Sequence, residues 1–197
     1  MDFNALIKRA TNILVRPAEE WLVIEKENTT KGGIMINYAL PFLIVIGIAT
    51  AIGSLVFSLG FFSITYVIAT AIMSVLVPIA GIYISAYIIN ALAPSFGSTP
   101  NLENAFKLVI YSYTASFLVS IVTGLLPILF FLGIAGLYSM YILWIGFEPM
   151  MKTPEDKKIG YAIVSILIII GVYAVLAMIM GLLVASMFLS NAAQLIL

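Results

Sequence analysis

Four side chains that can carry charge or form hydrogen bonds recur at helical spacing at the start of a very hydrophobic stretch. Residues 101–114 read NLENAFKLVIYSYT, and Glu103, Lys107, Tyr111 and Thr114 fall on one helical face. Glu103 stands four residues before Lys107, which is the favourable order for an ion pair within a helix. Ionisable groups in membrane helices usually face the bundle interior or a wet cavity. The pattern therefore predicts a polar wall along this helix, with the Glu–Lys pair at its rim.

Other polar side chains follow similar spacing near the ends of other hydrophobic runs. We expect them to form one polar cluster, made of Tyr87, Asn90, Glu103, Lys107, Tyr111, Tyr138, Tyr141, Glu148 and Lys152. A second interpretation places Glu103, Lys107 and Glu148 at headgroup depth, fully hydrated, with the tyrosines in an ordinary aromatic belt. The two interpretations predict a pocket and a flat interfacial surface, respectively.

Catalytic and metal-binding motifs are missing from the sequence. The chain has no cysteine and no histidine, which excludes thiol nucleophiles, imidazole chemistry and the usual zinc and haem ligands. Its only aspartates, Asp2 and Asp156, lie outside the hydrophobic runs, so an intramembrane aspartyl pair is excluded. Two glutamates near one membrane face make a poor metal site. Acid–base chemistry by Glu103 and Glu148 stays formally open, but we expect no enzyme activity and no cofactor.

The elements that position these residues must be membrane helices. Of the 197 residues, 63% are hydrophobic and 9% are charged, against about 45–50% and about 25% in a soluble domain. A bilayer core of about 30 Å needs about 20 apolar residues per helix. We therefore expect an all-α, polytopic membrane protein with five transmembrane helices, near residues 34–59, 62–93, 103–125, 127–147 and 160–189.

The basic residues set the orientation of these helices. Five lie in the first 33 residues, one is Lys107, and three lie in the loop before the last hydrophobic run. With five spans all nine fall on one side of the membrane, and the positive-inside rule places that side in the cytoplasm. We expect a multi-pass protein of the cytoplasmic (inner) membrane with its N-terminus in the cytoplasm and its C-terminus outside. The polar cluster then opens to the cytoplasm and is closed towards the outside.

Residues 1–33 form an expected amphipathic helical segment ahead of a five-helix transmembrane domain, residues 34–197. An apolar stripe within residues 3–14 alternates with basic side chains and describes a helix in the headgroup region. Pro17 suits the first turn of a second helix, and Trp21 is expected to anchor it at the interface. This segment either tethers and orients the bundle or forms a surface on which a partner docks.

Small residues indicate how the spans pack. Gly47 and Gly53 in the first run and Gly181 in the last belong to small-xxx-small patterns that let helix backbones approach closely. These patterns favour close packing within a bundle or between two copies of the chain.

Three fragments carry a family resemblance. They are PAEEWLVIEKEN at residues 17–28, APSFGSTPNLENAFKLVIYSYT at 93–114 and GLYSMYILWIGFEPMMKTPEDKKIGYAIV at 136–164. Together they resemble the Yip family of five-span membrane proteins. The Asp-Leu-Tyr-Gly-Pro motif of the eukaryotic, Rab-interacting members is missing, and Ala115 stands where the family often has proline. The resemblance therefore implies a bacterial-type member with the family's architecture, and it does not imply Rab binding.

Two functions of different classes fit this pattern. The leading hypothesis is a non-enzymatic membrane adaptor or scaffold whose cytoplasmic face binds a partner protein or a lipid headgroup. The alternative is a small-solute or ion transporter, or a channel-like protein, in which Tyr111, Tyr141 and Glu148 line a vestibule. The expected partners are the lipid bilayer, a protein on the cytoplasmic side or a second copy of the chain, and no nucleic acid.

Overall fold

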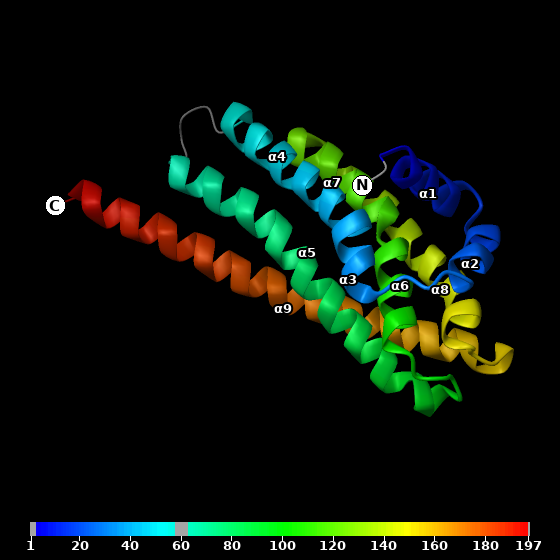
Figure 1. Cartoon of the computed structure of the whole chain (residues 1–197). Coiled ribbons are helices and arrows are strands. Elements are labelled where there is room, and N and C mark those ends of the chain that lie inside the picture. The colour runs from blue at the N-terminus through cyan, green and yellow to red at the C-terminus, as the bar shows by residue number, and fades with distance from the viewer. Residues whose placement is uncertain (1–2, 58–62, 197) are drawn as a thin grey trace.

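The chain folds into helices throughout the part that its structure, a computed structural model, describes: residues 3–57 and 63–196, with side chains omitted at 184 and from 186 onwards (Figure 1). The elements are α1 (Phe3–Val15), α2 (Pro17–Glu25), α3 (Lys31–Ile34), the π-helical turn η1 (Met35–Ala39), α4 (Leu40–Phe57), α5 (Ile64–Leu92), the 3₁₀ turn η2 (Ala93–Phe96), α6 (Leu102–Ser112), α7 (Thr114–Leu125), the 3₁₀ helix η3 (Pro127–Leu137), α8 (Tyr138–Met151) and α9 (Glu155–Ile196). This confirms the predicted all-α, polytopic class.

Four helical stretches are long and apolar enough to cross a membrane, and a bent pair makes five if its two helices count as one span. The four are Lys31–Phe57, Ile64–Phe96, Pro127–Met151 and Glu155–Leu183. Helices α6 and α7 pass the same test together, with a 42° bend between them. The predicted end of the first span at residue 59 and the predicted start of the second at residue 62 lie outside the described residues.

The spans form a bundle in which sequence-distant helices lie side by side. Helix α4 packs along α7, and α5 packs along α9 (Figure 1). Helices α1 and α2 lie with α6 and α8 at one end of the bundle, and the C-terminal end of α9 lies at the other. Aliphatic side chains cover the outer surfaces of α4, α5 and α9, as lipid contact requires. The helices of the first 33 residues pack against α6 and α8.

Helix α6 is the buried centre of that end. Residues 105–112 are all buried, although their sequence, AFKLVIYS, includes a lysine and two hydroxyl side chains. The helix begins at Asn101, whose side chain accepts a hydrogen bond from the Asn104 amide at 3.1 Å and so caps the first turn. Since protein covers every face of α6, its polar side chains must find partners within the protein.

The third span breaks at Tyr113 because hydroxyl side chains compete with the helical hydrogen bonds there. The hydroxyls of Ser112 and Thr114 each donate to a carbonyl of the preceding turn, at 2.6 Å, a pattern that bends helices. Beyond the break the Ser116 amide donates to Ser139 Oγ of α8 at 3.1 Å. The bend therefore occurs without a proline, and α8 satisfies an amide close to the break.

Helices α4 and α7 cross at two glycines. A Cβ atom on Gly53 would lie 2.0 Å from the carbonyl oxygen of Gly124, and a Cβ atom on Gly124 would lie 2.9 Å from Thr50 Oγ1. Such an approach of two backbones requires glycine. Gly181 has no atom within 4 Å of its Cβ position, so this glycine of α9 is not at a close helix crossing.

Candidate functional site

The N-terminal helices, expected to lie in the headgroup region, pack onto protein, and α1 does so with its apolar stripe. Leu6, Ala10 and Ile13 of α1 are buried, and Trp21 of α2 has no exposed surface. The Trp21 indole donates to the carbonyl oxygen of Ile142 in α8 at 3.1 Å. The prediction that Trp21 anchors the interface is therefore wrong, because its ring fills a space between α2 and α8.

Arg9 turns inward from α1 and joins two carboxylates. Its guanidinium forms ion pairs with Glu20 of α2 and with Glu27, just past the end of α2. Asn12 donates a further hydrogen bond to Glu20 at 3.0 Å. The Arg9 guanidinium carbon also lies 5.7 Å from the centre of the Tyr111 ring, within cation–π range. A residue expected on the polar, headgroup side of the helix thus forms the centre of a partly buried network.

The surroundings of Arg9 stabilise its charged form. Burial disfavours the charged guanidinium, but the interactions with Tyr111, Glu27 and Glu20 outweigh burial and raise the pKa of Arg9 above its ordinary value. Arg9 is therefore charged at every physiological pH. The network is a permanent electrostatic contact between α1, α2 and α6.

Glu103 and Lys107 both contact the segment that leads from α2 into the first span. The two side chains do not form an ion pair with each other in the part of the chain that the structure describes. The Glu103 carboxylate accepts from the Lys31 amide at the start of α3, where a helix leaves its first amides unpaired. The Lys107 ammonium donates to the main-chain carbonyl of Glu27. The expected Glu–Lys pair is replaced by two contacts with the N-terminal segment.

Two further residues of the predicted cluster contact α1 and α2. The Tyr138 hydroxyl donates to the carbonyl of Leu14 at 2.8 Å, near the end of α1, where helical carbonyls lack partners. Lys152, at the end of α8, forms an ion pair with Glu25 at the end of α2. Both contacts hold the ends of the N-terminal helices against α8.

The other four predicted residues lie on the outside of this arrangement. Tyr87 is half exposed and packs on a phenylalanine of α6. Asn90 keeps a buried Oδ1 atom without a hydrogen bond. The exposed ring of Tyr141 lies beside Tyr138, and Glu148 accepts from Lys158 at 2.8 Å.

The structure thus brings five of the nine residues together around residues 1–33 and leaves four apart from them. Glu103, Lys107, Tyr111, Tyr138 and Lys152 all contact the N-terminal segment, which fills the place where a pocket was expected. Neither of the two cavities described below is lined by any of the nine. A binding role for the polar cluster stays a prediction.

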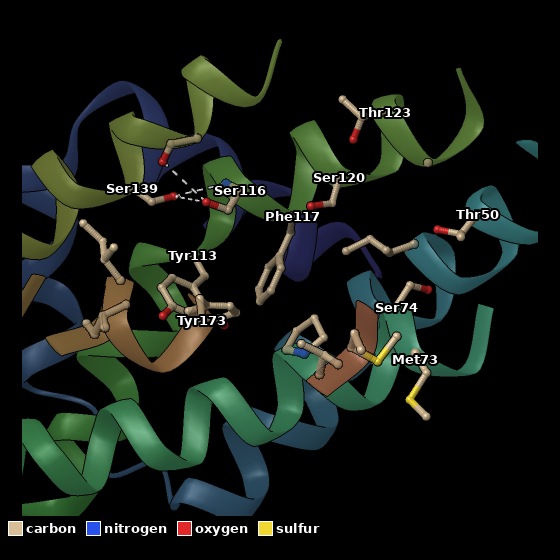
Figure 2. A pocket seen from close by; sticks show the side chains of 18 of the residues that line it. Thr50, Met73, Ser74, Tyr113, Ser116, Phe117, Ser120, Thr123, Ser139 and Tyr173 are labelled. Carbon is tan, nitrogen blue, oxygen red and sulfur yellow. Dashed lines mark hydrogen bonds between the residues drawn. The ribbon is translucent and has the colours of Figure 1, made fainter. Parts of the chain in front are cut away.

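A cavity of about 730 Å³ lies elsewhere, between α4, α5, α7, α8 and α9 (Figure 2). The surface of its walls is mainly apolar, but hydroxyl side chains line it from several helices: Thr50, Thr70, Ser74, Tyr113, Ser116, Ser120, Thr123, Ser139 and Tyr173. The sequence analysis placed the polar cluster elsewhere and named none of these hydroxyl residues as part of a site. The spacing of residues 116, 120 and 123 on one helical face was the signal that would have indicated it.

The comparisons with known proteins identify the family. The model of the Yip1 domain matches residues 11–177. The chain belongs to the Yip1 domain family. This match confirms the resemblance that the three sequence fragments indicated. The matched residues of this Yip-family protein include α2, α6 and α8. No curated protein and no solved structure matches it.

Within this Yip-family protein the polar residues of the network serve to join helices. Each charged group of the network has a partner: Arg9 has two carboxylates, Glu103 has an amide and Lys107 has a carbonyl. Partly buried charges that have partners on other helices favour the arrangement in which those partners meet. The site therefore acts as a fixed structural contact that positions the outer surfaces of α1 and α2.

Proposed function

We propose that this Yip-family membrane protein is a non-enzymatic adaptor, with α2 as the surface that binds a partner protein. The supporting observation is an exposed aliphatic pair on a helix that is otherwise firmly packed. Leu22 and Val23 keep 55% and 50% of their surface exposed, whereas the neighbouring Trp21 and Ile24 have none. A fixed helix that presents apolar side chains to its surroundings is typical of an interaction site.

The charges around this pair favour a protein over a lipid headgroup. Glu19 and Lys26 lie on the same face of α2, one turn before and one turn after the aliphatic pair. An anionic headgroup would favour a face with basic residues only. A partner protein with a complementary apolar patch and charges of both signs fits this face better.

The adaptor is proposed to work in the cytoplasmic (inner) membrane with its N-terminus in the cytoplasm and its C-terminus outside. The support is the distribution of basic residues, all nine of which lie on the N-terminal side of a five-span chain. In that orientation α2 lies on the cytoplasmic side, within reach of soluble proteins.

The alternative function, a transporter or channel-like protein with a vestibule on this side, has less support. Its proposed lining residues are Tyr111, Tyr141 and Glu148, and they lie in different surroundings: under Arg9, on the outer surface of α8, and beside Lys158. Flux of a substrate into proteoliposomes above that of empty vesicles would favour this alternative.

The adaptor proposal is tested by charge substitution on α2. We expect wild-type protein, purified in nanodiscs from native membranes, to carry a partner identified by quantitative mass spectrometry. The double variant Leu22→Asp/Val23→Asp should lose at least nine-tenths of that partner. The control Val15→Asp places one such negative charge on a residue of α1 that is 69% exposed, and it should retain the partner.

Unchanged melting temperature in all three proteins shows that the substitutions act on binding. If the double variant and the wild type carry the same proteins in the same amounts, the α2 surface is not a binding site and the proposal is wrong. If the double variant loses only anionic lipid, α2 binds headgroups instead of a protein.

A further inference from the structure

The cavity among the spans has walls that suit an uncharged molecule. Among the described residues that line it there is no Lys, Arg, Asp or Glu. A charged group brought into this space would lose its hydration without gaining a partner, which costs several kcal/mol. The volume of about 730 Å³ lies in the range, roughly 300–1,000 Å³, of sites for organic ligands.

Hydroxyl groups give these walls a defined chemistry. Ser116 and Ser139 bond to each other at 2.8 Å, and Ser74 donates to the carbonyl of the preceding turn at 2.8 Å. The hydroxyls of Ser120 and Thr123 have no hydrogen-bond partner in the part of the chain that the structure describes. Figure 2 shows these two on α7, across the cavity from Ser74 of α5.

Two more features add polar groups to this cavity. The hydroxyl of Thr50, at one end, likewise has no hydrogen-bond partner among the described residues. In α5, Pro78 lines the cavity and has no amide hydrogen, so the carbonyl of Ser74 lacks its usual helical donor. Donors and one acceptor are therefore available to a molecule that carries oxygen atoms.

A second cavity adjoins this space and lies between α7 and η3. It measures about 440 Å³, and four of its lining residues, Ser116, Ser120, Thr123 and Gly136, also line the first cavity. The others come from α7, from Pro127 at the turn and from η3. None of the eleven residues of η3 is buried, and the second cavity lies against this exposed 3₁₀ helix.

We propose that the two cavities form one binding site for an uncharged, oxygen-bearing lipid of the diacylglycerol class, which enters from the bilayer beneath η3. The free hydroxyls of Thr50, Ser120 and Thr123 donate to the ester carbonyls, and the lipid hydroxyl donates to the carbonyl of Ser74. The aliphatic walls hold the acyl chains. A phospholipid of the same length is excluded because its phosphate meets no positive charge.

The test uses photoactivatable lipids on the purified full-length protein. A diacylglycerol with a diazirine in one acyl chain is expected to label peptides of α7 and η3, and the phosphatidylglycerol with the same chain is expected to label them at least tenfold less. The variant Ser120→Phe fills the cavity and should reduce diacylglycerol labelling at least tenfold. Leu118→Phe is the matched control, because Leu118 lies two residues away on α7 and is 40% exposed; it should label like wild type.

A second variant keeps the test decisive if Ser120→Phe does not fold. Ser120→Ala/Thr123→Val removes two hydroxyls with little change in volume and should reduce diacylglycerol labelling several-fold. The proposal is overturned if either folded variant is labelled like wild type. Equal labelling of α7 and η3 by the phosphatidylglycerol probe also overturns it, because the cavity then holds bulk lipid without regard to charge.

Discussion

The ammonium group of Lys107, in the middle of the buried helix α6, donates a hydrogen bond to the main-chain carbonyl of Glu27. Eighty positions separate the two residues in the sequence, and the side chain of Lys107 is almost fully enclosed. A buried ammonium needs a strong acceptor, and here the acceptor belongs to the segment that precedes the first span. The contact explains why residues 1–33 lie against the bundle as part of its core.

Arg9→Met is expected to lower the free energy of unfolding by about 2 kcal/mol, because two carboxylates lose their common partner. The estimate is below the 3–5 kcal/mol of a fully buried pair, since the side chains of Arg9, Glu20 and Glu27 keep 19%, 10% and 30% of their surface exposed. Thermal unfolding in detergent measures it. Arg16→Met, at a pair that is over 70% exposed on both sides, should change stability by less than about 0.5 kcal/mol; a similar loss in both variants would contradict the prediction.

Gly146→Ala is expected to displace α2. The added Cβ atom would lie 2.5 Å from Leu108 Cδ1 and 2.6 Å from Trp21 Cε2, so the indole must move at a cost of about 1–3 kcal/mol. Melting temperature and the tryptophan emission spectrum report this change. Gly171→Ala is the control, because nothing lies within 4 Å of its Cβ position, and it should be neutral or slightly stabilising. A spectrum unchanged by Gly146→Ala would argue against the packing of Trp21.

The class and the family of the protein were predictable from the sequence, because a long apolar run has one stable solution in a bilayer and the fragment at residues 136–164 is the most specific of the three. The contacts of Arg9 and Trp21 with other helices were not predictable in the same way. Helical periodicity indicates that one face of a segment is buried, but it does not say whether lipid or protein covers that face. The contact of Lys107 was not predictable for a similar reason. Local spacing favours Glu103 as its partner, whereas the tertiary structure supplies the main-chain carbonyl of Glu27.

Ser139→Ala is expected to destabilise the bend of the third span by about 1 kcal/mol, in the range of hydrogen bonds within membrane proteins. The Ser139 hydroxyl accepts from the Ser116 amide at 3.1 Å and bonds to the Ser116 hydroxyl at 2.8 Å. Ser120→Ala removes a hydroxyl without a partner among the described residues and should leave the melting temperature of delipidated protein unchanged. Equal effects of the two substitutions would show that the contact with α8 does not stabilise the bend.

Tyr138→Phe is expected to loosen the end of α1 by about 0.5–1 kcal/mol. It removes the hydrogen bond to the carbonyl of Leu14 and keeps the aromatic ring. Faster hydrogen exchange and faster proteolysis within residues 3–15 would report the change. Tyr141→Phe is the matched control, because Tyr141 is a neighbouring exposed tyrosine with no hydrogen bond to the described residues. Protection of α1 that is the same in both variants would contradict a capping role for Tyr138.

The contacts of α6 with residues 1–33 also bear on how the protein is made. The N-terminal helices leave the ribosome before any span, so the Glu27 carbonyl and the Lys31 amide are in place when Lys107 and Glu103 reach the membrane. Lys107 lies near the start of its span, where a lysine in a membrane helix costs less than at the centre, and the Glu27 carbonyl gives its ammonium an acceptor within the protein. A chain that lacks its first 33 residues is therefore expected to insert its spans but to leave Glu103 and Lys107 without these two partners, so that α6 packs less firmly in the finished bundle.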